Sequence, residues 1–286
     1  MEIQQIILAA LQIALFASVL TLGFGANKAK PFYLIRRPRL FIRSLLAIYI
    51  VVPLVATILL VLVPLPISVK IGMILLTISS VATGSPHTMI RLGANPAYAY
   101  SLLMFMSLIS IVTVPFSLVI LSALPLTHDA SVPPLEVVKF IAQSILLPLM
   151  VGAIFSRLAP RLTERLSGPI NSISGKVLML GMLSLFALNI GGVVEAGVLS
   201  LVVILILTVI ALGAGHLLGG PAFGDRAALA IATTQRQMAI ATLIAAMNFQ
   251  NVVIIDAIVI YLIMSTLIVS VYVKWCKRQL VAQTKL

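Results

Sequence analysis

The sequence predicts an all-α polytopic membrane protein that forms a single domain. Of its 286 residues, 61% are hydrophobic and only 9% are charged, and the mean hydropathy is +1.20. Apolar runs of about 20 residues, the length of a transmembrane helix, recur along nearly the whole chain. These runs are continuous rather than alternating, so helices and not barrel strands are expected.

The apolar runs predict about nine transmembrane helices. The spans lie near residues 4–24, 41–62, 67–89, 96–122, 137–156, 176–194, 197–218, 227–248 and 252–274. The loops between them are too short for a second domain, so residues 1–286 are expected to form one transmembrane transporter domain. The inner loop at 157–176 is expected to form at most a short surface helix.

Positive residues gather in three places, and this predicts the orientation. They follow the first span, follow the fifth span and end the chain: Lys28, Lys30, Arg36, Arg37, Arg39 and Arg43; Arg157, Arg161, Arg165 and Lys176; Lys274, Lys277, Arg278 and Lys285. Nine spans put all three groups on one side. The positive-inside rule then predicts a multi-pass protein of the cell (inner) membrane, with the N-terminus outside and the C-terminus cytoplasmic. The net charge of +12 reflects this topology, so the expected partner is the lipid bilayer and not nucleic acid.

The third predicted span contains a polar interruption. It runs from Ser79 to Thr88, and its candidate site residues are Thr83, Gly84, Ser85, Pro86, His87 and Thr88. Pro86 lacks an N–H and its ring clashes with the preceding turn, and the carbonyls it frees must be satisfied by protein or water. One interpretation is a broken helix that lines a substrate site. The other is a helix that ends at Ser85 and leads into a cytoplasmic loop.

The eighth predicted span contains a charge near its middle. Thr233, Thr234, Gln235, Arg236 and Gln237 interrupt an apolar run, here without glycine or proline. A charge at the bilayer centre costs from about 3 to more than 10 kcal/mol, so such residues usually face a bundle interior or a water-filled path. Arg236 either recognises an anion through its planar fork of donors or pairs with Asp256. We favour anion recognition, because Asp256 is expected nearer the outer surface.

Other polar residues give weaker signals. His216 follows Gly213 and Gly215, and small residues of this kind usually indicate close helix packing. The sequence contains no metal-ligand cluster, phosphate loop or nucleophile–base pair, so we expect neither enzymatic activity nor a cofactor.

The order of several motifs resembles the bile acid:sodium symporter family. The motifs are Lys30-Pro31, Arg37-Pro38 and Pro53; Leu65-Pro66, Gly72, Thr83 to Ser85, Asn95 and Pro115; Gly213 to Gly219; and Leu229 to Phe249. The resemblance implies two inverted repeats, with spans 3 and 8 as discontinuous helices that cross at mid-membrane. It also implies a core of spans 2–4 and 7–9, a panel of spans 1, 5 and 6, and transport by alternating access.

The chain departs from the family pattern at the sodium ligands that the resemblance implies. A glutamate shared by two sodium ions falls on Ala232, and other ligands fall on Ile48, Pro86, Ala99 and Leu103, although Ser85 matches. Apolar side chains cannot compensate the dehydration of an ion. We therefore expect no bound metal and doubt that sodium binds.

These observations predict a secondary transporter of small organic anions without ordinary sodium coupling, in which the fixed charge of Arg236 substitutes for a sodium ion. Transport would be uniport, exchange or proton-coupled. His87 is a candidate proton carrier, or else only a partner for the broken backbone. The alternatives are a sodium-coupled symporter with a rearranged ion site and a non-transporting sensor on the same fold.

Overall fold

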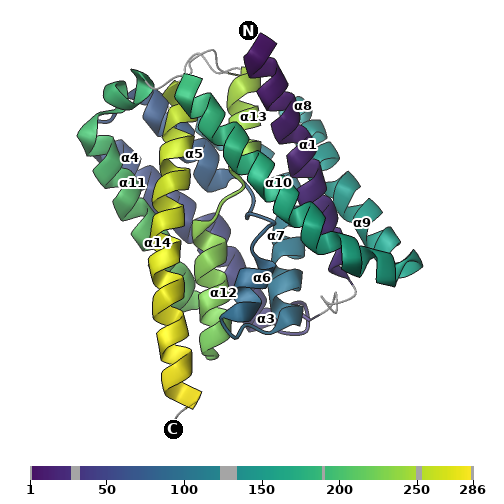
Figure 1. Ribbon diagram of the computed structural model, residues 1–286. Helices are drawn as coiled ribbons and strands as arrows, with labels where there is room; N and C mark the ends of the chain where they lie inside the picture. Colours follow the sequence, from purple (N-terminus) through teal and green to yellow (C-terminus); the bar gives the residue numbers. More distant parts are fainter. Residues whose placement is uncertain (1, 27–32, 123–133, 189–190, 249–252, 285–286) are drawn as a thin grey trace.

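The computed structural model describes residues 2–26, 33–122, 134–188, 191–248 and 253–284. These residues are almost entirely helical, and the two ends of the chain lie at opposite ends of the molecule (Figure 1). The all-α prediction is confirmed. The helices are α1 (Glu2–Phe24), α3 (Pro38–Leu45), η1 (Leu46–Val51), α4 (Val52–Leu62), α5 (Ile67–Ile78), α6 (Pro86–Arg91), α7 (Pro96–Ser122), α8 (Pro134–Ile141), η2 (Ala142–Leu146), α9 (Leu147–Leu158), α10 (Pro160–Leu188), α11 (Gly191–Leu218), α12 (Phe223–Thr234), α13 (Met238–Asn248) and α14 (Val253–Thr284).

Seven helical stretches in the described part of the chain are long and apolar enough to cross a membrane. They correspond to predicted spans 1, 2, 4, 5, 6, 7 and 9. Predicted spans 3 and 8 are each divided into two shorter helices, α5 with α6 and α12 with α13. The polytopic class is therefore confirmed. The count of nine, which requires each divided pair to cross the membrane once, remains a prediction.

The structure differs from the prediction after the fifth span. Helix α10 begins at Pro160 and continues to Leu188, where a loop with a short surface helix was expected. The polar residues of this segment do not interrupt it, because they bond within the helix; the Thr163 hydroxyl donates to the Pro160 carbonyl at 2.9 Å. Among the residues named from the sequence, Lys28, Lys30, Pro31, Phe249 and Lys285 lie outside the described part of the chain.

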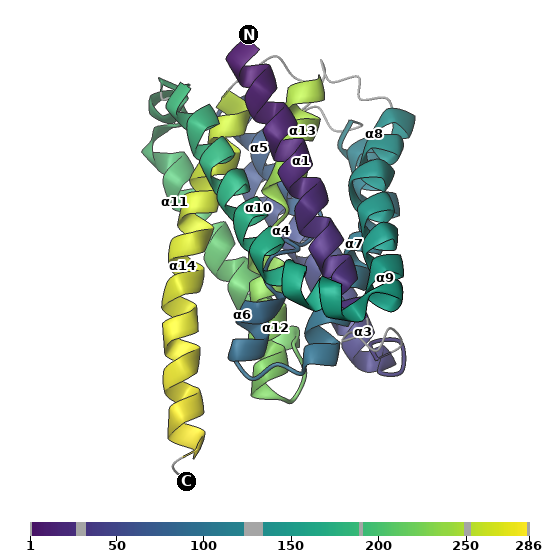
Figure 2. The same cartoon turned by 45° about the vertical axis from the view of Figure 1, so that its right-hand side comes forward.

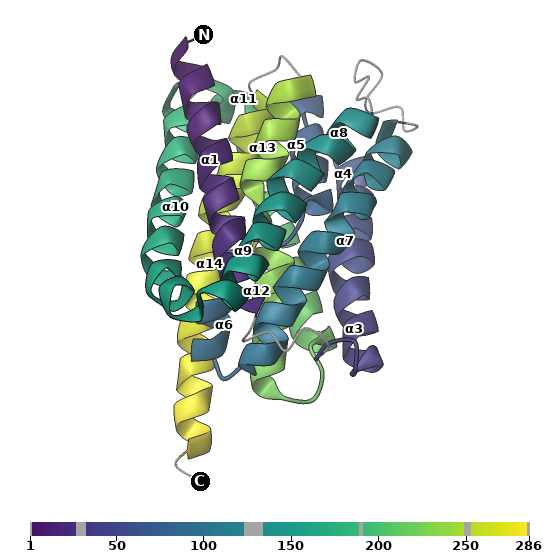
Figure 3. The same ribbon diagram turned by 90° about the vertical axis from the view of Figure 1, so that its right-hand side faces the viewer.

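The helices pack in two groups. Helix α1 packs against α9 and α10, and these three lie together in Figures 2 and 3. Helix α11 packs against α12 and α14, and α14 packs against α5. The first group corresponds to the predicted panel and the second belongs to the predicted core. The division into two moving domains stays a prediction.

Helices α11 and α12 approach closely at Gly215, within the glycine-containing segment. A Cβ atom at Gly215 would lie 2.6 Å from the Cα atom of Ala230, whereas one at Gly213 would meet nothing within 4 Å. His216 packs nearby, with its Nδ1 atom 2.6 Å from the hydroxyl of Tyr272. His216 is thus a packing residue, as predicted.

Candidate functional site

The two interrupted segments meet. Between α5 and α6, and between α12 and α13, the chain is extended, and Val81 forms an isolated antiparallel bridge with Arg236. The Gln237 N–H donates to the Ser80 carbonyl at 2.8 Å, and the Ala82 N–H donates to the Gln235 carbonyl at 3.0 Å. Each break thereby satisfies backbone groups of the other inside the protein, as membrane depth requires. The first interruption is a break with a helix on each side.

Helix C-termini and helix N-termini meet around the bridge. Helices α5 and α12 end there with their carbonyl groups, and α13 begins there with its N–H groups. Unpaired carbonyls at a helix C-terminus favour a cation, and unpaired N–H groups at an N-terminus favour an anion. The helix ends at the breaks therefore include some that favour a cation and some that favour an anion.

The guanidinium of Arg236 supplies the cation. The side chain is only 1% exposed. Its Nη2 donates to the Ile48 carbonyl at 2.7 Å, and its Nη1 donates to the Ser79 carbonyl at 3.2 Å. Its Nε is buried without a hydrogen-bond partner among the described residues. Both acceptors are main-chain oxygens, so neither of these bonds is the pairing with Asp256 that was the less favoured alternative. The guanidinium donates hydrogen bonds to backbone carbonyls instead.

The Ile48 carbonyl is available because of a local irregularity in the second span. Residues Leu46–Val51 form a π-helical turn, and the Val52 N–H donates to the Ala47 carbonyl, five residues back. The same spacing would pair the Ile48 carbonyl with the N–H of residue 53, but residue 53 is proline and has none. Ser79 lies just past the end of α5 with an extended ψ of 160°, so its carbonyl is also free of the helix. Arg236 thus donates hydrogen bonds to two carbonyls that have no partner within a regular helix.

The positions that match the family's sodium ligands offer no replacement ligands. The side chains of Ile48, Ala99, Leu103 and Ala232 are 0% exposed, and all four lack oxygen. Pro86 is buried at the first turn of α6. Across the described residues, no group of three or more His, Cys, Asp or Glu side chains is arranged to hold a metal ion. The residues present do not fit the family's two-sodium set.

A cavity of about 320 Å³, which we call the central cavity, adjoins the breaks. Helices α1, α10 and α14 complete its wall. Six of the predicted site residues line it: Gly84, Ser85, Thr88, Gln235, Arg236 and Gln237. Polar residues from the other helices also line it and were not predicted from the sequence, namely Ser18, Asn171, Ser265 and Thr266. Nothing in their spacing indicated a site, because they are single hydroxyls and amides in otherwise ordinary segments.

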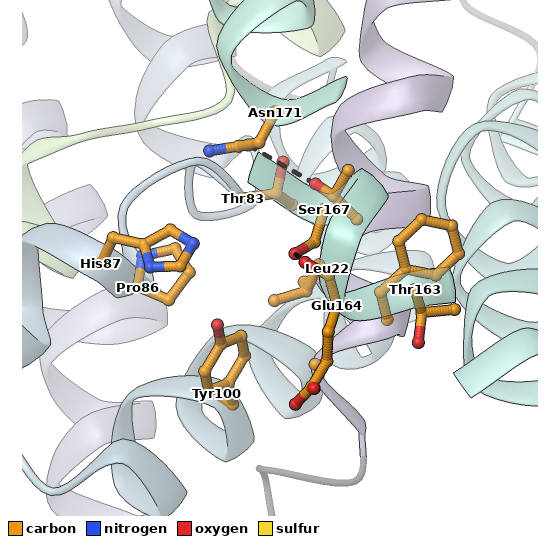
Figure 4. Close-up of a pocket in the computed structure, with 12 residues that line it drawn as sticks. Leu22, Thr83, Pro86, His87, Tyr100, Thr163, Glu164, Ser167 and Asn171 are labelled. Atoms are coloured by element: carbon orange, nitrogen blue, oxygen red, sulfur yellow. Dashed lines mark hydrogen bonds between the residues drawn. The ribbon is translucent and has the colours of Figure 1, made fainter. Parts of the chain in front are cut away.

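The remaining predicted residues lie elsewhere. Thr83, Pro86 and His87 line a much smaller cavity of about 20 Å³, with Glu164, Ser167 and Asn171 of α10 on its other side (Figure 4). Asn171 lines both cavities. Thr233 and Thr234 line neither cavity. The buried hydroxyl of Thr233 donates to the Ala211 carbonyl at 2.7 Å, and that of Thr234 donates to the Ala230 carbonyl at 2.8 Å. Both side chains therefore hold helices in place here and face neither cavity.

Thr83 connects the two breaks to the first helix. Its hydroxyl lies 2.8 Å from the hydroxyl of Ser18 on α1, and it accepts a bond of 3.4 Å from the Gln237 amide. The central cavity thus lies where α1 and α10 meet the two breaks.

The sequence model of the Sodium Bile acid symporter family matches residues 12–196. The chain belongs to this family. Members of the family are membrane transporters, and the chain is a transporter of this family with a small-molecule substrate. No curated protein matches the chain. The family match contains the first break and ends before α12, so Arg236 lies beyond it.

Proposed function

We propose that the protein is a secondary transporter of small organic anions that works by alternating access without ordinary sodium coupling. The observation that carries this proposal is the guanidinium of Arg236 on the carbonyls of Ile48 and Ser79. A guanidinium stays charged at all physiological pH values. The cation beside the breaks is therefore tethered to the chain, and it does not have to be bound and released in each cycle.

The central cavity is the proposed substrate site. At about 320 Å³ it suits a small ligand. The first residues of α13, Met238 and Ala239, line it, and the N–H groups in the first turn of a helix lack acceptors within the helix. They favour the charged end of an anion. The amide of Asn171 and the hydroxyl of Ser85 add polar contacts.

Another part of the central cavity lining is apolar. Leu178, Met179, Met182 and Leu262 line it. Methionine side chains adapt to ligands of different shapes. A small anion with a hydrocarbon portion would match both the polar and the apolar parts of this lining. We therefore propose an amphipathic organic anion as substrate.

Alternating access would move the predicted panel against the core. The bond between Ser18 and Thr83 joins α1 to the first break, so this motion would exchange it for another contact. We retain the proposed orientation, with the C-terminus in the cytoplasm. Without sodium, transport would proceed as uniport, as anion exchange or as proton-coupled transport. For the proton-coupled mode, His87 beside the small cavity is the candidate proton carrier.

Uptake into proteoliposomes tests the proposal. An organic anion that stabilises the purified protein is offered with either sodium or choline as the external cation. We expect saturable uptake at the same rate in both. Uptake in sodium alone would mean a sodium-coupled symporter with a rearranged site. Saturable binding without uptake would mean a sensor on the same fold.

A further inference from the structure

A separate cavity of about 780 Å³ lies between α3, the turn before α12 and the first residues of α12. We call it the basic cavity, because Arg37, Arg39, Arg43 and Arg226 line it. It shares no lining residue with the central cavity. Helix α3 and the start of α12 lie at the end of the molecule toward which the C-terminus points (Figure 1). The positive-inside rule accounts for basic residues at this end of the protein, but it does not require four arginines to line one space.

We infer that the basic cavity binds the phosphate headgroup of an anionic phospholipid from the leaflet at this end of the protein. Arginine recognises phosphate through paired donors of its planar guanidinium. Basic pockets between transmembrane helices on the cytoplasmic side are suited to such headgroups.

The arginines converge from two separate elements. Arg39 and Arg43 are four residues apart on α3 and so share one face of that helix. The guanidinium carbon of Arg37 lies 4.5 Å from the centre of the Tyr33 ring, and this contact holds the charged end of the side chain in place. Across the cavity, the Nε of Arg226 donates to the Gly220 carbonyl at 2.7 Å. That bond uses one donor of Arg226 and orients its terminal nitrogens.

The charge in the basic cavity is strongly unbalanced. Asp225 is the one acidic residue among its described lining residues, against four arginines. Asp225 is only 7% exposed, and its carboxylate accepts a bond from the backbone N–H of Asn95. Part of its charge is therefore already compensated within the protein. An anion in the cavity would meet an excess of positive charge.

Apolar side chains beside the arginines favour a lipid over a soluble phosphate. Leu217 lines the basic cavity and is 81% exposed, and Ile42, next to Arg43, is 53% exposed. Both belong to stretches long and apolar enough to cross a membrane. Exposed apolar side chains there would lie against acyl chains, while the arginine stems extend to the headgroup level. A soluble phosphate would use only the guanidinium groups.

The test measures the affinity of the full-length protein in detergent for short-chain phosphatidylglycerol, with phosphatidylcholine as the neutral lipid. The variant is Arg39→Gln with Arg43→Gln. The matched control is Arg161→Gln with Arg165→Gln, which removes the same charge at the same spacing on α10 and outside the basic cavity. We expect the first variant to lose about 30-fold in affinity for phosphatidylglycerol and the control to lose less than about threefold.

Three outcomes would overturn the inference. An equal loss in both variants would mean diffuse attraction of the whole basic surface. No loss in either would mean that the cavity does not bind the headgroup. Displacement of phosphatidylglycerol by inorganic phosphate at similar concentration would mean that the cavity takes a soluble anion. Arg39 and Arg43 are exposed, which favours folding of the variant; if it fails to fold, Arg43→Gln alone is expected to lose about fivefold.

Discussion

Replacing Arg236 by alanine removes the group that holds the two breaks to the second span. The guanidinium is the donor to the carbonyls of Ile48 and Ser79, at 2.7 and 3.2 Å. It is also only 1% exposed, so the side chain is almost entirely shielded from water in the folded protein. The variant therefore leaves two buried carbonyl groups without their donors.

The size of the effect follows from these two contacts. A buried polar group that loses its partner costs about 1–3 kcal/mol, which gives about 2–6 kcal/mol for both carbonyls. The variant no longer buries a charge, and this gain opposes the loss. Water that enters the vacated space would also lower the cost. We therefore expect the free energy of unfolding to fall by about 2 kcal/mol, near the lower end of this range.

Thermal or denaturant unfolding in detergent measures this change. Gln235→Ala is the control, because Gln235 is the adjacent residue and lines the central cavity; it is expected to change stability by less than about 0.5 kcal/mol. Arg236→Lys should fall between wild type and Arg236→Ala, since one ammonium cannot bridge two carbonyls as a fork does. Arg236→Ala with wild-type stability, or a lysine variant that is fully stable, would refute the reasoning.

Three further outcomes are expected. Gly215→Ala should lower stability by about 1–3 kcal/mol, because the added Cβ meets the α12 backbone, while Gly213→Ala should lower it by much less; equal losses in thermal unfolding would contradict the packing argument. Thr83→Val removes the bond to Ser18, about 1 kcal/mol, and should change uptake by up to about fivefold; unchanged uptake would mean that this bond is kept throughout the cycle. Burial raises the pKa of the Asp225 carboxyl above its value in the unfolded chain. Stability from this group should then fall as pH rises from the unfolded pKa of about 4 through the raised folded pKa, and the unfolding of Asp225→Asn should lack this pH-dependent component.

The sequence predicted the apolar spans and both interruptions for physical reasons that the structure bears out. The glycine, proline and hydroxyl residues between positions 79 and 88 predicted a break, and the structure has one between Ile78 and Pro86, where α6 begins. The break at Gln235 was harder to predict, because it has neither glycine nor proline. It depends on the bridge between Val81 and Arg236, which is a tertiary contact.

Two features of the site could not be predicted from the sequence. The acceptors of Arg236 depend on the π-helical turn before Pro53, and such a turn leaves no clear pattern in an apolar run. The α10 wall of the central cavity was also missed. Asn171 and Gly175 lie in a segment that the polar composition placed in a loop, whereas the structure has them within α10.

The most direct test of the central claim is ligand-induced thermal stabilisation in two salts. The purified protein is heated with each of a panel of small organic anions, with sodium or with choline as the only cation. A ligand stabilises the folded state according to its concentration relative to its dissociation constant. If Arg236 stands in place of the sodium ion, the effective anions will stabilise the protein equally in both salts. Stabilisation in sodium alone would contradict the account.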